Sequence, residues 1–158
     1  MMVNSVHKVV SSPARPNTKN HSDMTKKVMA ILAGLLSAII IVSLGDALAG
    51  YLAPPSANHN RTDPAALKSY VAGLPAYVLV IMLCFWLLSS LAAGYISGRI
   101  CPSSGRTLGL ICGGVLLGGA LLNMTMLPHP VWLMLSAIVG YLPSAMFGTK
   151  LAMSKTKT

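Results

Sequence analysis

Three polar side chains, Asp46, Asn123 and His129, lie in or beside long apolar segments of this chain. Asp46 is the one charged side chain inside any of these segments, and a carboxylate in lipid requires a partner, a watery recess or a proton. Counted back from Pro54 at 1.5 Å per residue, Asp46 lies about 12 Å inside the first segment. A carboxylate at that depth points to proton transfer, cation binding or a structural hydrogen bond.

Helical spacing indicates which groups approach Asp46. Asn123 lies about 7.5 Å inside its segment, counted from Pro128, and His129 stands in the turn that follows. A contact of Asp46 with Asn123 or His129 is therefore geometrically reasonable. Tyr77 is the fourth candidate of this polar cluster. One interpretation is a proton-linked or substrate-binding site that opens outward, and the other is a buried hydrogen bond that fixes helix register.

Other chemistry has little support in the residue pattern. The three cysteines stand singly, without a CxxC pair, and suit the role of small apolar side chains. His59, Asp63 and His129 match no metal-ligand spacing, and no glycine-rich phosphate loop follows a strand. We therefore expect no metal site, no cofactor and no assignable catalytic residue, and the sequence favours a protein that is not an enzyme.

Small residues recur at four-residue spacing, which lets helix backbones approach closely in lipid. The packing candidates are Gly94, Gly98, Gly109, Gly113, Gly114 and Gly118. In one interpretation they form a dimer seam or a sliding surface, and in the other they make ordinary contacts within a single bundle. The second interpretation is favoured because such spacing is common in membrane helices.

The elements that must hold these residues follow from composition. Of 158 residues, 54% are apolar and only 9% are charged, which is too few charges for the surface of a water-soluble domain. Twelve Lys and Arg face three acidic residues, so the formal net charge is +9. The basic residues suit topology signals and lipid headgroups rather than nucleic acid. The composition therefore indicates a polytopic membrane protein.

Four apolar runs are long enough to cross a bilayer core of roughly 30 Å as helices, and none alternates like a barrel strand. The chain is therefore predicted to be all-α, a four-transmembrane-helix antiparallel bundle within residues 27–152. The basic tail 1–26 is expected to be disordered, and 153–158 is a second polar tail. The predicted spans are 28–52, 75–98, 107–127 and 130–150.

The connection 53–74 is predicted to be an external loop with a short helix over 64–72. Asp63 is the expected N-cap of this helix, and Gly73 is its expected end. The apolar face of the helix is expected to lie on the membrane surface. This face consists of Leu67, Tyr70 and Val71.

The distribution of Lys and Arg predicts the orientation, because these residues are held on the cytoplasmic side of membranes. Five lie in the N-terminal tail, two in the second connection and three in the C-terminal tail, and all of these segments share one side. Arg61 and Lys68 lie on the other side. Both termini are therefore expected in the cytoplasm. An aromatic belt is expected at the outer boundary, formed by Tyr51, Tyr70, Tyr77 and Trp132.

Two short patterns carry a resemblance to known proteins. The first is Asp63-Pro64 followed by Leu74-Pro75, and the second is Asn123 followed by the PHPVW segment 128–132. Over residues 24–152 the chain resembles a group of small four-span bacterial inner-membrane proteins. The resemblance implies a bacterial inner-membrane location and brings no activity with it.

Three functions stay open at this level. The small-residue faces and the lack of catalytic groups favour an accessory or interaction protein of a membrane complex. An alternative is a small proton-linked transporter centred on Asp46, and a second is a membrane-interface enzyme that uses Asp46 and His129. The expected partners are the lipid bilayer and either another membrane protein or further copies of the chain.

Overall fold

The computed structural model describes residues 18–55, 63–127 and 129–154, and within these ranges the chain forms helices and no strand. The helices in chain order are α1 (Thr18–Leu52), α2 (Pro64–Ala72), α3 (Ala76–Ile100), the short 3-10 helix η1 (Pro102–Ser104), α4 (Gly105–Met126) and α5 (Val131–Ser154). In this part of the chain, α1, α3, α4 and α5 are long and apolar enough to cross a membrane. The prediction of an all-α chain with four candidate spans is confirmed.

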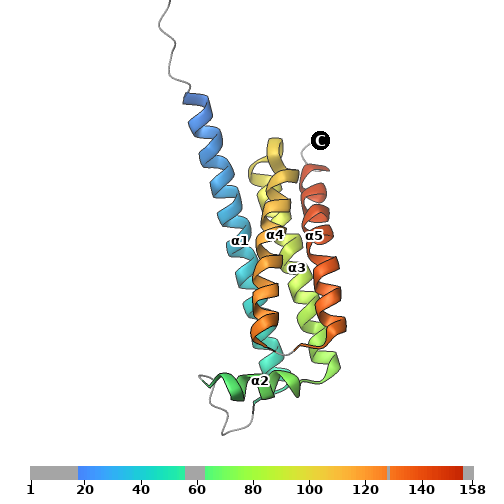
Figure 1. Cartoon of the computed structure of the whole chain (residues 1–158). Helices are drawn as coiled ribbons and strands as arrows, with labels where there is room; N and C mark the ends of the chain where they lie inside the picture. The colour runs from blue at the N-terminus through green and yellow to red at the C-terminus, as the bar shows by residue number, and fades with distance from the viewer. Residues whose placement is uncertain (1–17, 56–62, 128, 155–158) are drawn as a thin grey trace, which may run out of the picture.

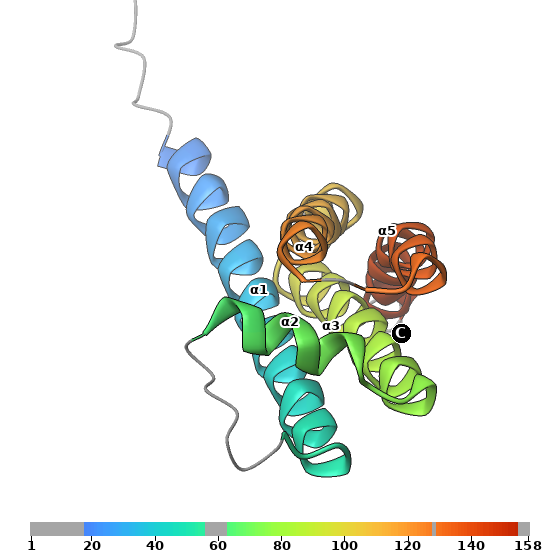
Figure 2. The same ribbon diagram turned by 60° about the horizontal axis from the view of Figure 1, so that its bottom comes forward.

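The helix α3 lies at the centre of the arrangement. It packs against α1, α4 and α5, whereas α1 makes less contact with α4. The four long helices lie side by side, with the start of α1 and the end of α5 at one end of the molecule (Figure 1). At the opposite end, α2 lies across the long helices (Figure 2). We call these the tail end and the α2 end.

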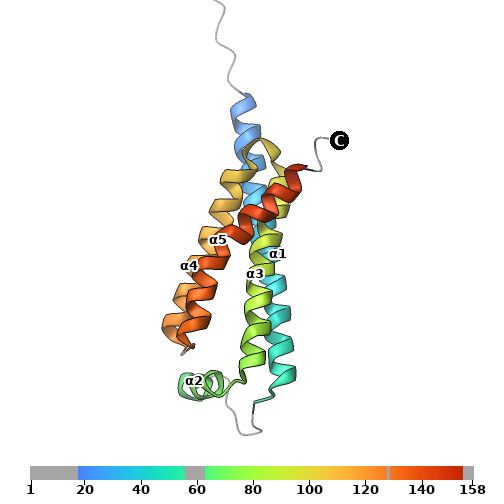
Figure 3. The ribbon, with the colours of Figure 1, turned by 90° about the vertical axis from the view of Figure 1, so that its right-hand side faces the viewer.

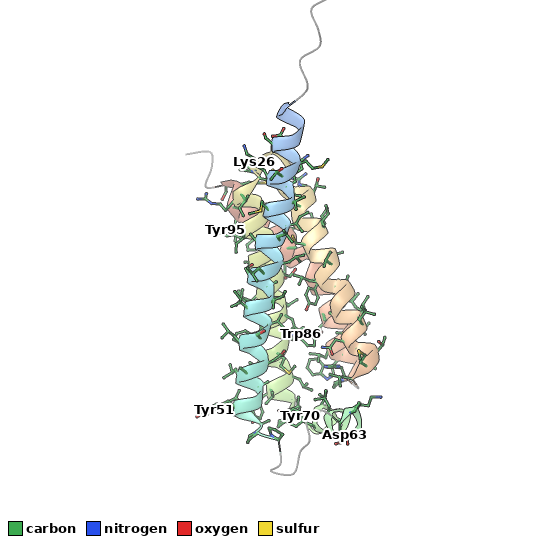
Figure 4. All side chains as sticks on the ribbon, turned by 90° about the vertical axis from the view of Figure 1, so that its left-hand side faces the viewer. Lys26, Tyr51, Asp63, Tyr70, Trp86 and Tyr95 are labelled. Carbon is green, nitrogen blue, oxygen red and sulfur yellow. The ribbon has the colours of Figure 1, made fainter. Side chains whose placement is uncertain are left out.

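The two ends carry different charges. Among the described side chains, five cations belong to helix ends that meet at the tail end, where Figure 4 labels one of them, Lys26. At the α2 end, the described cation is Lys68 of α2. The five cations of the tail end are Lys26, Lys27, Arg99, Arg106 and Lys150.

Local signals form α2 with the bounds that the sequence predicts. The Asp63 carboxylate accepts a hydrogen bond from the Ala65 backbone N–H (3.0 Å), and Pro64 takes the first helical position. Backbone hydrogen bonds from Gly73 to the last turn end the helix.

The apolar face of α2 covers the end of the bundle. Val71 is buried, and Leu67 and Tyr70 line a cavity beneath α1. The Tyr70 hydroxyl donates a hydrogen bond to the Ala53 carbonyl oxygen (2.7 Å), which ties α2 to the end of α1. Part of this face, at Val71, is thus buried within the chain, and the expectation that the face lies on the membrane surface stays a prediction.

The helix α1 begins earlier than the sequence predicts. Disorder was expected over residues 1–26, but residues 18–26 belong to α1, so the expectation is wrong there. Residues 1–17 lie outside the described part of the chain. Once the apolar segment is helical, adding a polar residue needs no new nucleation, so the helix extends into the tail.

Glycines bring α3, α4 and α5 together at backbone distance in the half of the bundle nearer the tail end. A Cβ atom at Gly94 would collide with the Ala145 carbonyl oxygen, and one at Gly109 would lie 2.8 Å from Thr149 Cγ2. These contacts join helices of one chain, as in the second interpretation of the glycine spacing. The candidate glycines that approach a neighbouring helix in this way are Gly94, Gly98, Gly109 and Gly113.

The other two candidate glycines, Gly114 and Gly118, face away from the rest of the described chain. A Cβ atom at either position would meet nothing within 4 Å. Close packing inside the bundle was expected at both, and this is wrong for the pair. Successive helical residues point about 100° apart, so the face of α4 that bears Gly113 packs while the adjacent face does not.

The half of the bundle nearer the α2 end is held by larger side chains. There α4 and α5 diverge from α1 and α3, as Figure 3 shows. The space between them contains an apolar cluster of mostly bulky residues, and the glycine nearest to it, Gly140, meets the Leu87 side chain rather than backbone. The buried members of this cluster are Leu79, Trp86, Met124, Leu133, Ala137 and Tyr141.

Candidate functional site

Asp46 is the central residue of the candidate site. It lies in α1 two turns before the helix ends, and its side chain is exposed, whereas Ala49 on the same face is buried. The carboxylate forms no hydrogen bond or ion pair with any residue that the structure describes. Its charge is therefore not compensated within this part of the chain.

A cavity of about 310 Å³ lies beside this carboxylate at the α2 end. Residues from α1, α2, α3, α4 and the α2–α3 and α4–α5 connections line it, so it depends on the packing of segments far apart in sequence. Its polar lining residues are Asp46, Tyr70, Asn123 and His129. Its apolar lining residues are Ala49, Leu67, Val71, Leu74, Met82 and Leu127.

His129 is held in place by two contacts. Its Nδ1 lies 3.0 Å from the Leu127 carbonyl oxygen, within hydrogen-bonding distance. Its ring packs against the indole of Trp86, with ring centroids 5.8 Å apart and planes tilted by 59°. Trp86 is buried and lies toward the α2 end in Figure 4. The imidazole is thus fixed at the wall of the cavity.

Asn123 connects this cavity to a second, more apolar one. It lies in the last turn of α4, where its backbone carbonyl accepts a hydrogen bond from the Leu127 N–H (3.0 Å). Its exposed side chain lines both the cavity beside Asp46 and a cavity of about 380 Å³ between α1 and α4. The second cavity is also lined by Ser43, Trp86 and Tyr141. Asn123 therefore stands where a polar pocket meets an apolar groove.

The structure brings together three of the four residues predicted to form the polar cluster. Asp46, Asn123 and His129 line one cavity, although no hydrogen bond joins them among the described residues. Tyr77 does not line it and has 56% of its surface exposed. Tyr70 of α2 takes that place. The sequence signal for Tyr70 was its position on the apolar face of α2, which was assigned to the membrane surface.

Other reactive groups add no second centre to the described chain. Among the described residues, no group of three or more His, Cys, Asp or Glu side chains lies close enough to hold a metal ion. His59 lies outside the described residues. The cysteines are free: Cys84 is exposed, and Cys101 and Cys112 are buried.

The chemistry of the cavity suits a positively charged guest. A carboxylate supplies negative charge, and the aromatic ring of Tyr70 can lie against a cation. The described residues of the lining include no Lys or Arg to attract an anion, and no Ser, Thr or Cys to act as a nucleophile. The arrangement can bind a cation or exchange a proton.

Comparisons with known proteins add no assignment, since no protein-family model, curated protein or solved structure matches the chain. The resemblance to small four-span bacterial proteins stays a prediction.

Proposed function

We propose that the chain is a multi-pass protein of the bacterial inner membrane, an antiparallel four-helix bundle with both termini in the cytoplasm. The five cations at the tail end support this orientation, because Lys and Arg are retained on the cytoplasmic side. Three aromatic side chains near the α2 end are exposed, which suits the boundary between lipid and water. They are Tyr51, Tyr77 and Trp132.

Cysteine labelling in intact cells tests this orientation. Single cysteines are placed at Ser69 in α2 and at Ser154 at the end of α5, both exposed, in a chain whose own cysteines are replaced by alanine. Ser69→Cys is expected to react with an impermeant maleimide from outside. Ser154→Cys is expected to react only after the membrane is opened. The reverse pattern would overturn the proposed orientation.

We further propose that the cavity at the α2 end binds a small organic cation and that the protein exchanges this cation for protons across the membrane. The observation that carries the proposal is the Asp46 carboxylate, which lines the cavity without a compensating partner among the described residues. An acidic side chain within a membrane span marks ion and proton pathways by default. Cation and proton compete for the same carboxylate, which is the simplest basis for exchange.

The shape of the bundle supports access from one side. At the α2 end, α4 and α5 diverge from α1 and α3, and the cavity lies in this wider part (Figure 3). Toward the tail end, Gly94 and Gly109 bring α3, α4 and α5 into contact. A carrier whose binding site is open to one side of the membrane has this form, because closely packed helices block the path to the other side.

The geometry gives the transporter more support than the sequence does. The accessory role rested on small-residue faces, and four of the six candidate glycines pack within the chain itself. The interface-enzyme alternative loses support, because Asp46 and His129 share no hydrogen bond and, among the residues that the structure describes, no Ser, Thr or Cys side chain lines the cavity.

Tetraethylammonium is a suitable probe because it is small, permanently charged and does not cross bilayers unaided. Its binding to the purified protein is measured by calorimetry, and its uptake into proteoliposomes is measured under an imposed proton gradient. Asp46→Asn is expected to weaken binding about tenfold or more, because a charge-assisted contact is lost. The same variant is expected to stop proton-driven uptake.

Asp63→Asn is the matched control. It removes a carboxylate at the same end of the molecule that does not line the cavity, and Asn is as good an N-cap as Asp. It is expected to bind and transport like the wild type. His129→Gln is expected to slow uptake more than it weakens binding. Equal activity of the Asp46→Asn variant and the wild type would overturn the proposal.

The outward face of α4 supports a second candidate function, the accessory or interaction protein. Gly114 and Gly118 form a GxxxG pair with nothing within 4 Å, next to the exposed apolar side chains of Val115 and Leu122. In lipid, such a pair lets a second helix approach closely. We propose that this face contacts a helix of another membrane protein or of a second copy.

Association in mild detergent tests the second candidate. The double variant Gly114→Leu/Gly118→Leu is expected to keep the fold and to lose association, as measured by light scattering and by co-purification. Gly50→Leu on α1 is the control, since a Cβ at Gly50 also meets nothing within 4 Å. Unchanged association in the double variant would exclude this face as the interface.

A further inference from the structure

A third cavity, lined by positively charged side chains, lies at the tail end, on the outer side of the contact between α4 and α5. Its volume is about 730 Å³. Two cations line it: Arg106 in the first turn of α4 and Lys150 in the last turns of α5. The rest of the lining is Pro143, Met146, Phe147, Thr149, Met153 and Ser154.

The floor and the cations of this cavity have different neighbours. Gly105 packs near the Met153 sulfur, and Gly109 packs on Thr149, so the inner faces of the two helices close the floor. Arg106 and Lys150, each one residue further around its helix, are exposed. Neither forms an ion pair or hydrogen bond with a residue that the structure describes. Both cations therefore remain available to an anion.

The acidic residues of the chain do not line this cavity, so they do not compete with an anionic ligand for the two cations. Of the three acidic residues of the chain, Asp46 and Asp63 lie toward the α2 end, and Asp23 lies on α1 and does not line this cavity. Arg can bind phosphate through two parallel hydrogen bonds, and Lys adds a compact charge. The polar part of the cavity thus complements a phosphate group.

The apolar part of the cavity follows the direction of a lipid chain. Lys150 lies about 6 Å from the end of α5, at 1.5 Å per residue, and Met146 lies about 6 Å further toward the middle of the helix. Met146 and Phe147 are half exposed. A ligand with a phosphate at one end and hydrocarbon at the other fills both parts.

We propose that this cavity binds an anionic phospholipid of the leaflet at the tail end, with the lipid phosphate between Arg106 and Lys150 and an acyl chain along Met146 and Phe147. Basic pockets between membrane helices hold lipid headgroups in this way. The proposal is independent of the cation site at the α2 end, because the two cavities share no lining residue.

The test compares lipids added to the purified protein in detergent, with dioleoyl phosphatidylglycerol as the probe and dioleoyl phosphatidylcholine as its zwitterionic counterpart. Native mass spectrometry measures lipid retention, and thermal unfolding measures stabilisation. The wild type is expected to prefer phosphatidylglycerol. Arg106→Gln/Lys150→Gln is expected to weaken its binding by roughly tenfold to thirtyfold, the effect of two cations near a headgroup.

A control variant removes the same number of charges at the same end. Lys26→Gln/Arg99→Gln alters cations that do not line the cavity, and it is expected to bind phosphatidylglycerol like the wild type. The exchange Arg106→Lys/Lys150→Arg conserves the charge, so this variant is expected to keep most of the phosphatidylglycerol binding that the double glutamine variant loses. This exchange also gives a folded comparison if the double glutamine variant does not fold.

Three results would overturn the proposal. Equal losses in the control and in the double glutamine variant would show a general charge effect. Equal binding of phosphatidylcholine by the wild type would exclude recognition of an anionic lipid. Full displacement of phosphatidylglycerol by glycerol phosphate would indicate a site for a soluble phosphate, since the hydrocarbon part would then contribute nothing.

Discussion

The two halves of the helix bundle use opposite kinds of packing. Toward the tail end, Gly94 and Gly109 let the backbones of α3, α4 and α5 meet. Toward the α2 end, bulky residues such as Trp86 and Tyr141 hold the helices further apart, and two cavities lie among them. Close backbone packing leaves no room for a ligand between the helices of the tail half, where the cavity of about 730 Å³ lies on the outer side of α4 and α5, whereas the α2 half has cavities between its helices.

The two halves also differ in whether their polar side chains have hydrogen-bond partners. In the tail half, Ser97 and Thr149 are buried, and each donates a hydrogen bond to a carbonyl of its own helix. In the α2 half, Asp46 is without a hydrogen bond or ion pair among the described residues. A buried polar group that is satisfied locally stabilises the fold, whereas an unsatisfied carboxylate beside a cavity is available to a ligand.

The largest expected effect breaks the closely packed half. Gly94→Leu would drive a side chain into the Ala145 backbone, so we expect a loss of stability of about 3 kcal/mol or more, or no folded protein. Gly114→Leu on α4 meets open space and gains helix propensity, so its stability is expected to change by less than about 1 kcal/mol. Thermal unfolding in detergent measures both. Similar losses in the two variants would contradict the assigned packing of α4.

A smaller effect is expected at the boundary between the halves. The Ser90 hydroxyl of α3 donates a hydrogen bond to the Tyr141 carbonyl oxygen of α5 (2.7 Å), and both residues are buried. Ser90→Ala is expected to destabilise the protein by about 1 kcal/mol, the usual size of such a bond in membranes. Ser89→Ala is the control, because Ser89 is equally buried but bonds to the Trp86 carbonyl of its own helix. A larger loss at Ser89 would mean that this interhelical bond contributes little.

The smallest effect concerns the cover of the α2 half. Tyr70→Phe removes the hydrogen bond to the Ala53 carbonyl and keeps the ring in the cavity wall. A hydrogen bond of this kind contributes about 1 kcal/mol to stability, so its loss is expected to make amide exchange within α2 roughly fivefold faster. The free energy of global unfolding is expected to change little. Tyr77→Phe, at an exposed position outside the cavity lining, is expected to leave exchange unchanged. Unaltered exchange in the Tyr70→Phe variant would show that packing alone holds α2.

The sequence alone determined the elements of this protein, because their causes are local. Long uncharged runs predict four helices, since a backbone in lipid must satisfy its own hydrogen bonds, and the described part of the chain has four such helices. Asp63, Pro64 and Gly73 predict the bounds of α2, because capping acts within a few residues. Three of the four residues predicted for the polar cluster line one cavity, and the sequence pointed to them because polar groups in or beside apolar segments are rare.

Only the tertiary structure decided which face of each helix meets which neighbour. Gly113 and Gly114 are adjacent and chemically identical, yet one packs on α5 and the other faces away. Tyr70 rather than Tyr77 completes the cavity, because α2 folds back over the end of the bundle. Each span is apolar on most sides, so periodicity cannot mark its packed face. In lipid, shape fit between helices replaces hydrophobicity as the basis of association, and that fit exists only once the helices are assembled.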